Sequence, residues 1–315
     1  MTKRKPTKLE ASVSARLNKL ARERRDDFQL VLLRYANERL LYRLSQSPHA
    51  ESFVLKGAAL FTLWTGRPHR ATRDIDLLGF GDTSEAHIHD VFNDVLTLDL
   101  PDDGVAFDLA TMVVSAIRED QAYGGVRVVL FAHVASARVR LQVDVGFGDA
   151  ITPPATVIDF PALLDFPAPR LRAYPRETVV AEKLEAMVQL GISNSRMKDF
   201  YDVALLARDF DFDGELLCRA VRATFARRGT PLPLDTPVAL SAAFAEDSSK
   251  RTQWSGFARK ANVSDIGTLS DALEAVRQFL LEPLQSVARG NAFVRTWRAG
   301  GPWRVDDAAT PNPLR

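Results

Sequence analysis

The 315-residue chain has little cysteine and almost no net charge. Cys218 is its single cysteine, which excludes an internal disulfide and a zinc site built from cysteines. Lys and Arg total 41 against 40 Asp and Glu, so the formal net charge of +1 indicates no class of partner. The sequence also shows no internal repeat and no long low-complexity segment.

Long apolar runs are missing as well. No run approaches the ~20 residues of a membrane helix, and the N-terminal residues lack the hydrophobic stretch of a secretory signal. We therefore expect a cytoplasmic protein with no membrane partner. The five histidines show no metal-ligand spacing, and the close pair His87 and His89 falls in a segment expected to be an exposed helix.

What the chain does contain is enough apolar residues for a sizeable core and a basic N-terminal arm. Hydrophobic residues make up 46%, which suits one large or two modest domains. Residues 1–25 carry nine Lys or Arg against two acids. Such an arm is typical either of a nucleic-acid contact or of a solvated basic helix.

Hydrophobic periodicity predicts an α/β (α+β) fold in two parts. Residues 9–46 are predicted to form a helical arm, broken once. Strands are then expected at 53–55, 74–78, 105–109, 111–117, 125–133 and 139–145, with helices at 58–64 and 85–98. From about residue 178 the pattern is helical. We predict a core domain over 1–168, including the arm, and a helical domain over 169–315.

Asp74 and Asp76 stand two positions apart inside an apolar run. On a strand, such positions point to the same side, so both carboxylates would project together while Ile75 and Leu77 pack the other way. Two aligned carboxylates suit Mg²⁺, which can hold the phosphates of a nucleotide. The alternative is a strand edge with two solvated acids.

Gly57 and Asp144 add to this pattern. Gly57 follows a predicted strand and opens a helix, where backbone N–H groups can approach a phosphate. Asp144 lies in an alternating run, and a third carboxylate around divalent ions suits an in-line displacement at phosphorus. Asp144 could accept the proton of the attacking hydroxyl. The alternative is that Asp144 pairs with Arg138, Arg140 or another base on the sheet.

The helical half contributes Lys183. This lysine borders the apolar face of its predicted helix, where it could meet a β- or γ-phosphate. The alternative is a surface lysine that pairs with Glu182 or Glu185.

A second charged segment of this half begins near residue 194. Asp199 and Asp202 share a helix face, and Asp199 could orient Lys183 or Lys198 in a site. The alternative is a charged first helical turn, with Ser195 as N-cap and Lys198 paired to Asp202.

The order of strand, Gly57, helix, loop and Asp-x-Asp strand resembles the nucleotidyltransferases of the DNA polymerase β superfamily. Two departures are Ala58 at the second small position and an offset of 17 residues from Gly57 to Asp74. Over residues 28–230, the joint order of motifs resembles the AbiEii/AbiGii toxin-type nucleotidyltransferases. The motifs are Lys56-Gly57-x-x-Leu60, Arg73-Asp74-x-Asp76-Leu77, Asp144-x-Gly146-Phe147-Gly148-Asp149, Tyr174-Pro175-x-Glu177-Thr178 to Ala181-Glu182-Lys183, and Arg196-x-Lys198-Asp199-Phe200-Tyr201-Asp202.

The resemblance implies a nucleotidyltransferase-fold mixed sheet with flanking helices, and a helical domain that contributes Lys and Asp to the cleft. It also implies a Mg²⁺-dependent toxin of a toxin–antitoxin or phage-defence (abortive infection) system, with a cognate antitoxin as partner. Such an enzyme would transfer a nucleotide from an NTP to RNA, at the 3′ end of tRNA, and block translation.

By the same resemblance, the site residues take specific roles. The resemblance assigns Asp74 and Asp76 to the metal, and the strand pattern adds Asp144 as the third predicted ligand. Lys183 would hold the triphosphate, and Asp199 would complete the catalytic set. The nucleotide would be lined by Lys56, Gly57, Thr72, Arg73 and Lys198.

Two other functions stay open on the sequence. One is nucleotidyl transfer to a protein side chain, similar to AMPylation. The other is an NTP-binding or antitoxin-binding module without turnover. Basic clusters favour the RNA acceptor; they are Arg16, Lys19, Arg22, Arg24, Arg25, Arg219, Arg222, Arg227 and Arg228.

Overall fold

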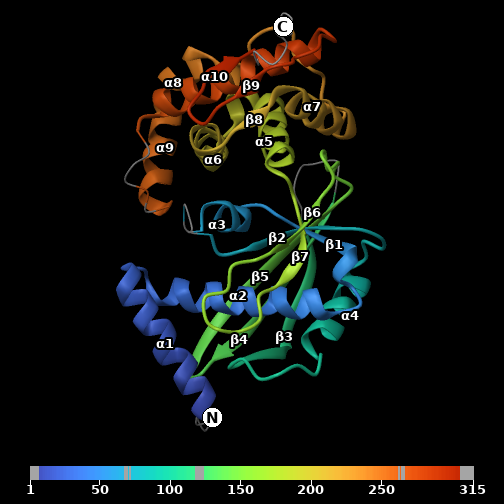
Figure 1. The fold of residues 1–315 in the computed structure, drawn as a ribbon, viewed down its shortest axis with the longest axis vertical. Coiled ribbons are helices and arrows are strands. Elements are labelled where there is room, and N and C mark those ends of the chain that lie inside the picture. Colours follow the sequence, from blue (N-terminus) through green and yellow to red (C-terminus); the bar gives the residue numbers. More distant parts are fainter. Residues whose placement is uncertain are drawn as a thin grey trace, which may run out of the picture. The chain divides into compact units, whose positions relative to one another are not determined.

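The computed structural model describes residues 7–66, 70, 72–117, 124–261, 263 and 267–305 (Figure 1). The chain divides into two compact units. The first unit comprises Met1–Gly148 and Ala155–Tyr174, and the second comprises Asp149–Pro154 and Pro175–Arg315. Among the described residues, no helix combines the length and the apolar character that crossing a membrane requires.

A seven-stranded mixed sheet forms the centre of the first unit. Its strand order is β3-β4-β5-β2-β1-β7-β6, in which β2 runs parallel to β5 and β1 to β7, while the other neighbours are antiparallel. The strands are β1 (Phe53–Lys56), β2 (Ile75–Gly79), β3 (Val105–Ile117), β4 (Gly125–Val134), β5 (Ala137–Phe147), β6 (Thr156–Asp159) and β7 (Arg170–Ala173). The predicted mixed sheet is confirmed.

Two details of this sheet differ from the sequence-based prediction. Residues 105–117 form one long strand, in which the register shifts between Asp108 and Val113, rather than two strands. Strands β6 and β7 were not predicted, because four residues are too few for an alternating pattern to stand out. The pair Gly124-Gly125 suggests a turn element before the predicted strand at 125–133, and Gly125 is the first residue of β4. Residues 118–123 lie outside the described residues.

In the described part of the first unit, the α-helices are α1 (Lys8–Arg24), α2 (Phe28–Gln46), α3 (Ala59–Thr65) and α4 (Glu85–Leu96). The predicted break in the N-terminal arm is confirmed between α1 and α2. Arg25 takes the left-handed conformation at the end of α1, with φ of 55°. Asp27 then caps α2 by accepting a hydrogen bond from the Leu30 N–H at 3.0 Å.

The sheet has one covered and one open face. Helix α2 packs on β5 and α4 packs on β3 (Figure 1). The buried side chains of β4 and β5 alternate along the strands: Val126, Val128, Leu130, Ala132, Val134, Val139, Leu141, Val143 and Val145. The intervening residues point to the opposite face, where Arg138 and Arg140 are exposed and Val113 is 60% exposed. The polar residues of the candidate site lie on this open face.

Helices make up most of the second unit: α5 (Arg176–Leu190), α6 (Met197–Asp209), α7 (Gly214–Arg228), α8 (Ala242–Glu246), α9 (Ser248–Ala261) and α10 (Leu269–Ala288). Helix α5 packs against α7, and α6 packs against α10. The predicted helical half is thereby confirmed.

The second unit also holds a small sheet that the sequence pattern did not predict. Its strands, in the order β10-β9-β8, are β8 (Phe212–Asp213), β9 (Thr296–Trp297) and β10 (Trp303–Arg304). Trp297 and Trp303 pack around Phe279, with ring centroids 5.0 Å and 5.7 Å away. The polar composition after Gly300 predicts an irregular tail, and this prediction is wrong at β10, where burial of Trp303 orders the chain.

Candidate functional site

Four charged side chains form one row across the open face of the first unit. Lys56 in β1 is the register partner of Asp76 in β2, and Asp76 is the partner of Asp144 in β5. Asp144 is in turn the partner of Arg127 in β4. Directly opposite residues on neighbouring strands share a face. The two acids therefore stand side by side between two cations, which offsets the repulsion that neighbouring carboxylates experience.

Arg127 binds Asp144 as a bidentate ion pair. The guanidinium donates from Nε to Oδ1 at 2.7 Å and from Nη2 to Oδ2 at 2.8 Å. Gln142 Nε2 adds a hydrogen bond of 3.3 Å to each oxygen. Asp144 thus pairs with a base on the sheet, and that base is Arg127 rather than Arg138 or Arg140. Binding of a metal or a proton by Asp144 requires one of these hydrogen bonds to be given up.

Sequence reasoning missed Arg127, although the signal was present. The two-residue turn at Ala135-Ser136 joins β4 to β5, and the register that starts at this turn places residue 127 opposite residue 144. Ala135 has φ of 53° in this turn. The turn lacks the Asn-Gly or Asp-Gly pair by which such turns are usually recognised.

Gly57 allows the chain to pass close to Asp76. Its φ is +73°, and a Cβ placed on it would overlap the Asp76 carboxylate, so a glycine is required on both grounds. Lys56 Nζ lies 5.4 Å from the ring centroid of Tyr174. A Cβ on Gly146, next but one to Asp144, would lie 3.9 Å from the same ammonium. Lys56 therefore extends over the open face beside the two acids.

The two aspartates near Gly57 fit a metal that is shared with a substrate. Asp76 lies in β2, whereas Asp74 is the residue just before the first residue of this strand. Both side chains are half-buried. Mg²⁺ is usually bound by one or two carboxylates together with waters and substrate phosphates. Within the described ranges, no group of three or more His, Cys, Asp or Glu side chains is placed to hold a metal ion. The residues therefore suit an open site rather than a closed protein cage.

Two further predicted nucleotide contacts precede β2. Thr72 is half-buried and Arg73 is exposed. The main-chain oxygen of Arg73 accepts a hydrogen bond from Asn37 Nδ2 of α2 at 3.2 Å, which anchors this segment to the helix. The predicted loop between α3 and β2 includes residues 67–69 and 71, which lie outside the described residues.

Lys183 is the centre of an ion-pair cluster in the second unit. Its Nζ donates to Asp199 Oδ1 at 2.7 Å and to Asp202 Oδ2 at 2.8 Å. Arg196 Nε donates to the other oxygen of Asp199 at 2.7 Å. Both aspartates are fully buried, and the Lys183 side chain is 13% exposed. Two cations match two acids, so these four side chains are neutral as a group.

The charges around Asp199 decide its protonation. Burial acts to raise the pKa of its carboxyl, but the Lys183 ammonium and the Arg196 guanidinium outweigh burial, so the pKa of Asp199 lies below its ordinary value. Asp199 therefore stays ionised and orients Lys183. Lys198 is exposed on the same helix.

The start of α6 differs from the sequence-based alternative. The N-cap position is Arg196 rather than Ser195. Asn194 Oδ1 accepts a hydrogen bond from the Arg196 N–H at 2.8 Å, and this local turn moves the helix start one residue along the chain.

Arg228 forms ion pairs with Glu182 and Glu185, the two acids that the alternative interpretation assigned to Lys183. It contacts Glu185 at 2.7 Å, Asp149 at 2.9 Å and Glu182 at 3.6 Å. Burial acts to lower the pKa of Arg228, but the three acids outweigh it and raise that pKa. Arg228 was counted among the basic residues that favour RNA. Its ion pairs instead hold the segment with Asp149 to helices α5 and α7.

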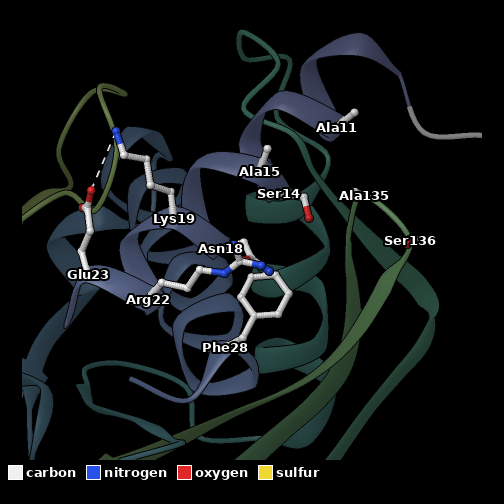
Figure 2. A pocket seen from close by; sticks show the side chains of 10 residues that line it. All are labelled: Ala11, Ser14, Ala15, Asn18, Lys19, Arg22, Glu23, Phe28, Ala135 and Ser136. Carbon is white, nitrogen blue, oxygen red and sulfur yellow. Dashed lines mark ion pairs between the residues drawn. The ribbon is translucent and has the colours of Figure 1, made fainter. Parts of the chain in front are cut away.

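The N-terminal arm contributes cations to a pocket in the first unit. This pocket has a volume of about 660 Å³, and α1 and the β4–β5 turn line it together (Figure 2). Lys19 and Arg22 border it from α1, and Ser136 borders it from the turn. Lys19 Nζ also lies 3.8 Å from Glu23 of the same helix. The arm is thus a packed helix with a partly neutralised basic face.

Comparison with known proteins gives a family and two structural likenesses. Residues 39–280 match the family described as nucleotidyl transferase AbiEii toxin, type IV toxin–antitoxin system. JHP933 from Helicobacter pylori is similar at 14% identity and a TM-score of 0.45, over 84% of this chain and 94% of that chain. A H. pylori protein assigned as a nucleotidyltransferase is similar at 15% identity and a TM-score of 0.43, with the same coverage of 84% and 94%. No curated protein matches the chain.

Proposed function

This chain belongs to the AbiEii nucleotidyl transferase toxin family, and we propose that it transfers a nucleotide from an NTP to the 3′ end of an RNA, with tRNA as the acceptor. Family membership makes it a nucleotidyltransferase of a toxin–antitoxin system. Beyond family membership, four features of this function are proposed. They are the tRNA acceptor, the need for Mg²⁺, the block of translation, and a cognate antitoxin that relieves this block. Both substrates are available in the cytoplasm, where we place the reaction.

The charged row on the open face of the first unit carries the proposal. Transfer at phosphorus depends mainly on positioning and on charge stabilisation rather than on covalent chemistry by the protein. Asp74 and Asp76 would hold Mg²⁺ together with the NTP phosphates, and the ion would neutralise charge on the phosphates. Gly57 accommodates the Asp76 carboxylate, which a side chain at this position would displace. Lys56 adds a cation on the same row.

The proposed reaction joins the acceptor to the nucleotide in one displacement. The acceptor hydroxyl oxygen forms a bond to the α-phosphorus, the bond from that phosphorus to the bridging oxygen breaks, and pyrophosphate leaves with the electron pair. The hydroxyl proton passes to a carboxylate on the open face, for which Asp144 is the predicted acceptor. Asp144 can take this role only after it gives up one of its hydrogen bonds to Arg127 or Gln142.

Lys183 and Lys198 belong to the same proposal as triphosphate contacts. Asp199 and Asp202 hold the Lys183 ammonium in a fixed orientation. A preoriented ammonium loses little side-chain entropy when a phosphate binds it. Lys198 is exposed near the start of α6, where an anion can reach it.

Label transfer tests the proposal. Each α-³²P NTP is incubated with Mg²⁺ and either total tRNA or cell protein, using the wild-type chain and the variant Asp74→Ala plus Asp76→Ala. The control variant Asp90→Ala plus Asp94→Ala removes two carboxylates from exposed positions of α4. We expect labelled RNA with the wild type and the control but not with the Asp74/Asp76 variant. Label on protein would favour the AMPylation-like alternative, and NTP binding without any label would favour a module without turnover.

A further inference from the structure

The open face of the first unit continues beyond the charged row towards the β4–β5 turn. Its side chains there form an arginine stripe, which we define as Arg127, Phe131, His133, Arg138 and Arg140. Register places Phe131 opposite Arg140 and His133 opposite Arg138. These residues alternate with the buried valines and leucines of β4 and β5, so they all point away from the covering helices.

Arg138 and Phe131 form a stacked pair within the stripe. The guanidinium carbon of Arg138 lies 3.6 Å from the ring centroid of Phe131, while Arg138 itself is exposed. A guanidinium laid over a ring keeps its outer plane and its N–H edge directed to solvent. Nucleobases stack on such planes, and phosphates accept hydrogen bonds from such edges. The pair is therefore preorganised for one nucleotide unit.

Hydrogen bonds connect the stripe to the charged row. Arg140 Nη1 donates to Gln142 Oε1 at 3.3 Å, and Gln142 Nε2 donates to Asp144, which also accepts from Arg127. From residue 138 to residue 144, β5 covers about 20 Å at roughly 3.3 Å per residue. That length corresponds to about six stacked nucleotides at 3.4 Å each. The stripe can thus guide a strand along β5 to the row with Asp76.

The charge and shape of the stripe favour a nucleic acid over a protein partner. Asp108 stands opposite Phe131 on the same face, but Arg138 and Arg140 outnumber it. The β4–β5 turn at the end of the stripe also borders the pocket with Lys19 and Arg22 (Figure 2). Arginines next to aromatic rings on an open sheet are a typical surface for single-stranded RNA.

We propose that the arginine stripe binds the single-stranded RNA acceptor and leads its 3′ end to the charged row. This inference rests on the proposed function and adds the surface that recognises the acceptor. Arg138 and Arg140 are positioning residues, since they contact the strand rather than the reacting phosphorus.

Oligonucleotide binding without NTP or metal tests the stripe. The probe is a short fluorescein-labelled oligoadenylate, and its fluorescence anisotropy is followed over a range of salt concentrations. We expect Arg138→Gln plus Arg140→Gln to weaken binding on the order of tenfold. The slope of log K against log salt should fall by about 1.4, because each phosphate contact on a single strand contributes about 0.7.

A matched variant separates the stripe from other basic surfaces. Arg259→Gln plus Lys260→Gln removes the same charge from exposed positions of α9 in the second unit. We expect this variant to bind the probe with the wild-type affinity and slope. Equal losses in both variants, or no loss in the Arg138/Arg140 variant, would overturn the inference. Circular dichroism melting of each variant verifies that the fold is retained.

A second substitution tests the stacking geometry. Arg138→Lys keeps the charge but removes the plane over Phe131. We expect weaker binding of the probe with an unchanged salt slope, and binding equal to the wild type would overturn the stacking role.

Label transfer distinguishes failure of this inference from failure of the proposed function. If RNA is labelled and the Arg138/Arg140 variant keeps the wild-type KM for RNA, the arginine stripe does not bind the acceptor, while the transferase proposal stands. If the stripe binds the oligonucleotide as expected but RNA is never labelled, the proposed acceptor chemistry fails and the binding surface stands. We expect a raised KM for RNA with an unchanged KM for NTP.

Discussion

The aspartates of the two units are held in contrasting ways. In the first unit, Asp76 is half-buried on an open sheet face and packs against Gly57, whose missing side chain makes room for the Asp76 carboxylate. In the second unit, Asp199 and Asp202 are fully buried and bind Lys183 directly. The same side chain therefore serves as an accessible ligand in one unit and as a fixed counter-ion in the other.

The difference teaches where a charge can take part in chemistry. A carboxylate at an open face can exchange protein or water contacts for a metal ion at little cost. A buried ion pair cannot, because removing one partner leaves an uncompensated buried charge at about 3–5 kcal/mol. We therefore assign the exchangeable contacts to the first unit and the fixed orientation of a lysine to the second.

The largest expected effect is on activity at Asp76. Asp76→Asn should reduce nucleotidyl transfer on the order of 10³-fold, because a metal ligand supports several kcal/mol of transition-state stabilisation. The free energy of unfolding should change by less than about 1 kcal/mol, as at other partly exposed sites. Label transfer and urea unfolding measure the two quantities. A large loss of stability with little loss of activity would contradict the contrast between the units, because Asp76 would then be a structural residue like Asp199.

The next effect is on stability at Asp199. Asp199→Ala should lower the free energy of unfolding by about 3–5 kcal/mol, because Lys183 and Arg196 lose a buried counter-charge. Asp209→Ala, at the end of the same helix and paired with Arg208, should change it by less than about 0.5 kcal/mol. Urea unfolding of both variants provides the measurement, and equal values would contradict the structural role of Asp199.

A smaller effect is expected at Gly57, and Gly66 provides a matched control. Both glycines have positive φ, +73° and +70°, but only a Cβ at Gly57 would overlap Asp76. Gly57→Ala and Gly66→Ala should each cost about 1–2 kcal/mol for the left-handed backbone. Only Gly57→Ala should also lower transfer by about 10²-fold, because it displaces the carboxylate of Asp76, which we propose to hold Mg²⁺. Similar activity of both variants would show that Gly57 has no role in the site.

The smallest effect is a pH dependence of opposite sign in the two units. The pKa of Asp199 is lowered in the folded state, so its stabilisation is complete above the unfolded value of 3.8 and is lost as the pH falls through the folded pKa. In the first unit, Glu38 of α2 is buried beside Arg39. Burial raises the pKa of Glu38 above its unfolded value of 4.5, although Arg39 acts to lower it. The ionised carboxylate therefore lowers the stability of the folded state above the folded pKa, and this loss disappears as the pH falls to 4.5.

Acid unfolding of two variants measures this contrast. The wild type loses the stabilisation from ionised Asp199 below pH 3.8, so the difference in free energy of unfolding between it and Asp199→Asn should become smaller there. Glu38→Gln, compared with the wild type, should gain relative stability as the pH rises above 4.5. The same sign of change in both variants would contradict the contrast.

The sequence predicted the elements of the site better than their partners. The shared face of Asp74 and Asp76 stays a prediction, because β2 begins at Ile75 and Asp74 precedes the strand. Asp199 was expected to orient Lys183 or Lys198, and it contacts Lys183. Arg127 was missed because its role depends on the register of a hairpin whose turn has no typical residues. Arg228 was interpreted as a surface base, although three acids from distant positions surround it.

The same division holds for the fold. The long helices and the strands with clear alternation were predicted, whereas β6, β7 and the small sheet of β8, β9 and β10 were not. The missed strands have two to four residues each. Strands this short are stabilised by pairing with distant segments, since a few residues carry no periodic pattern of their own.

By itself, the sequence determined the long helices, the strands with clear alternation, and the family to which the chain belongs. These properties depend on spacing within a short window, where backbone geometry sets the direction of each side chain. Only the tertiary structure decided the partners of Asp144, Lys183 and Arg228 and the open face of the sheet. Register, burial and ion pairing arise from contacts between distant segments, and those contacts exist only once the chain has folded.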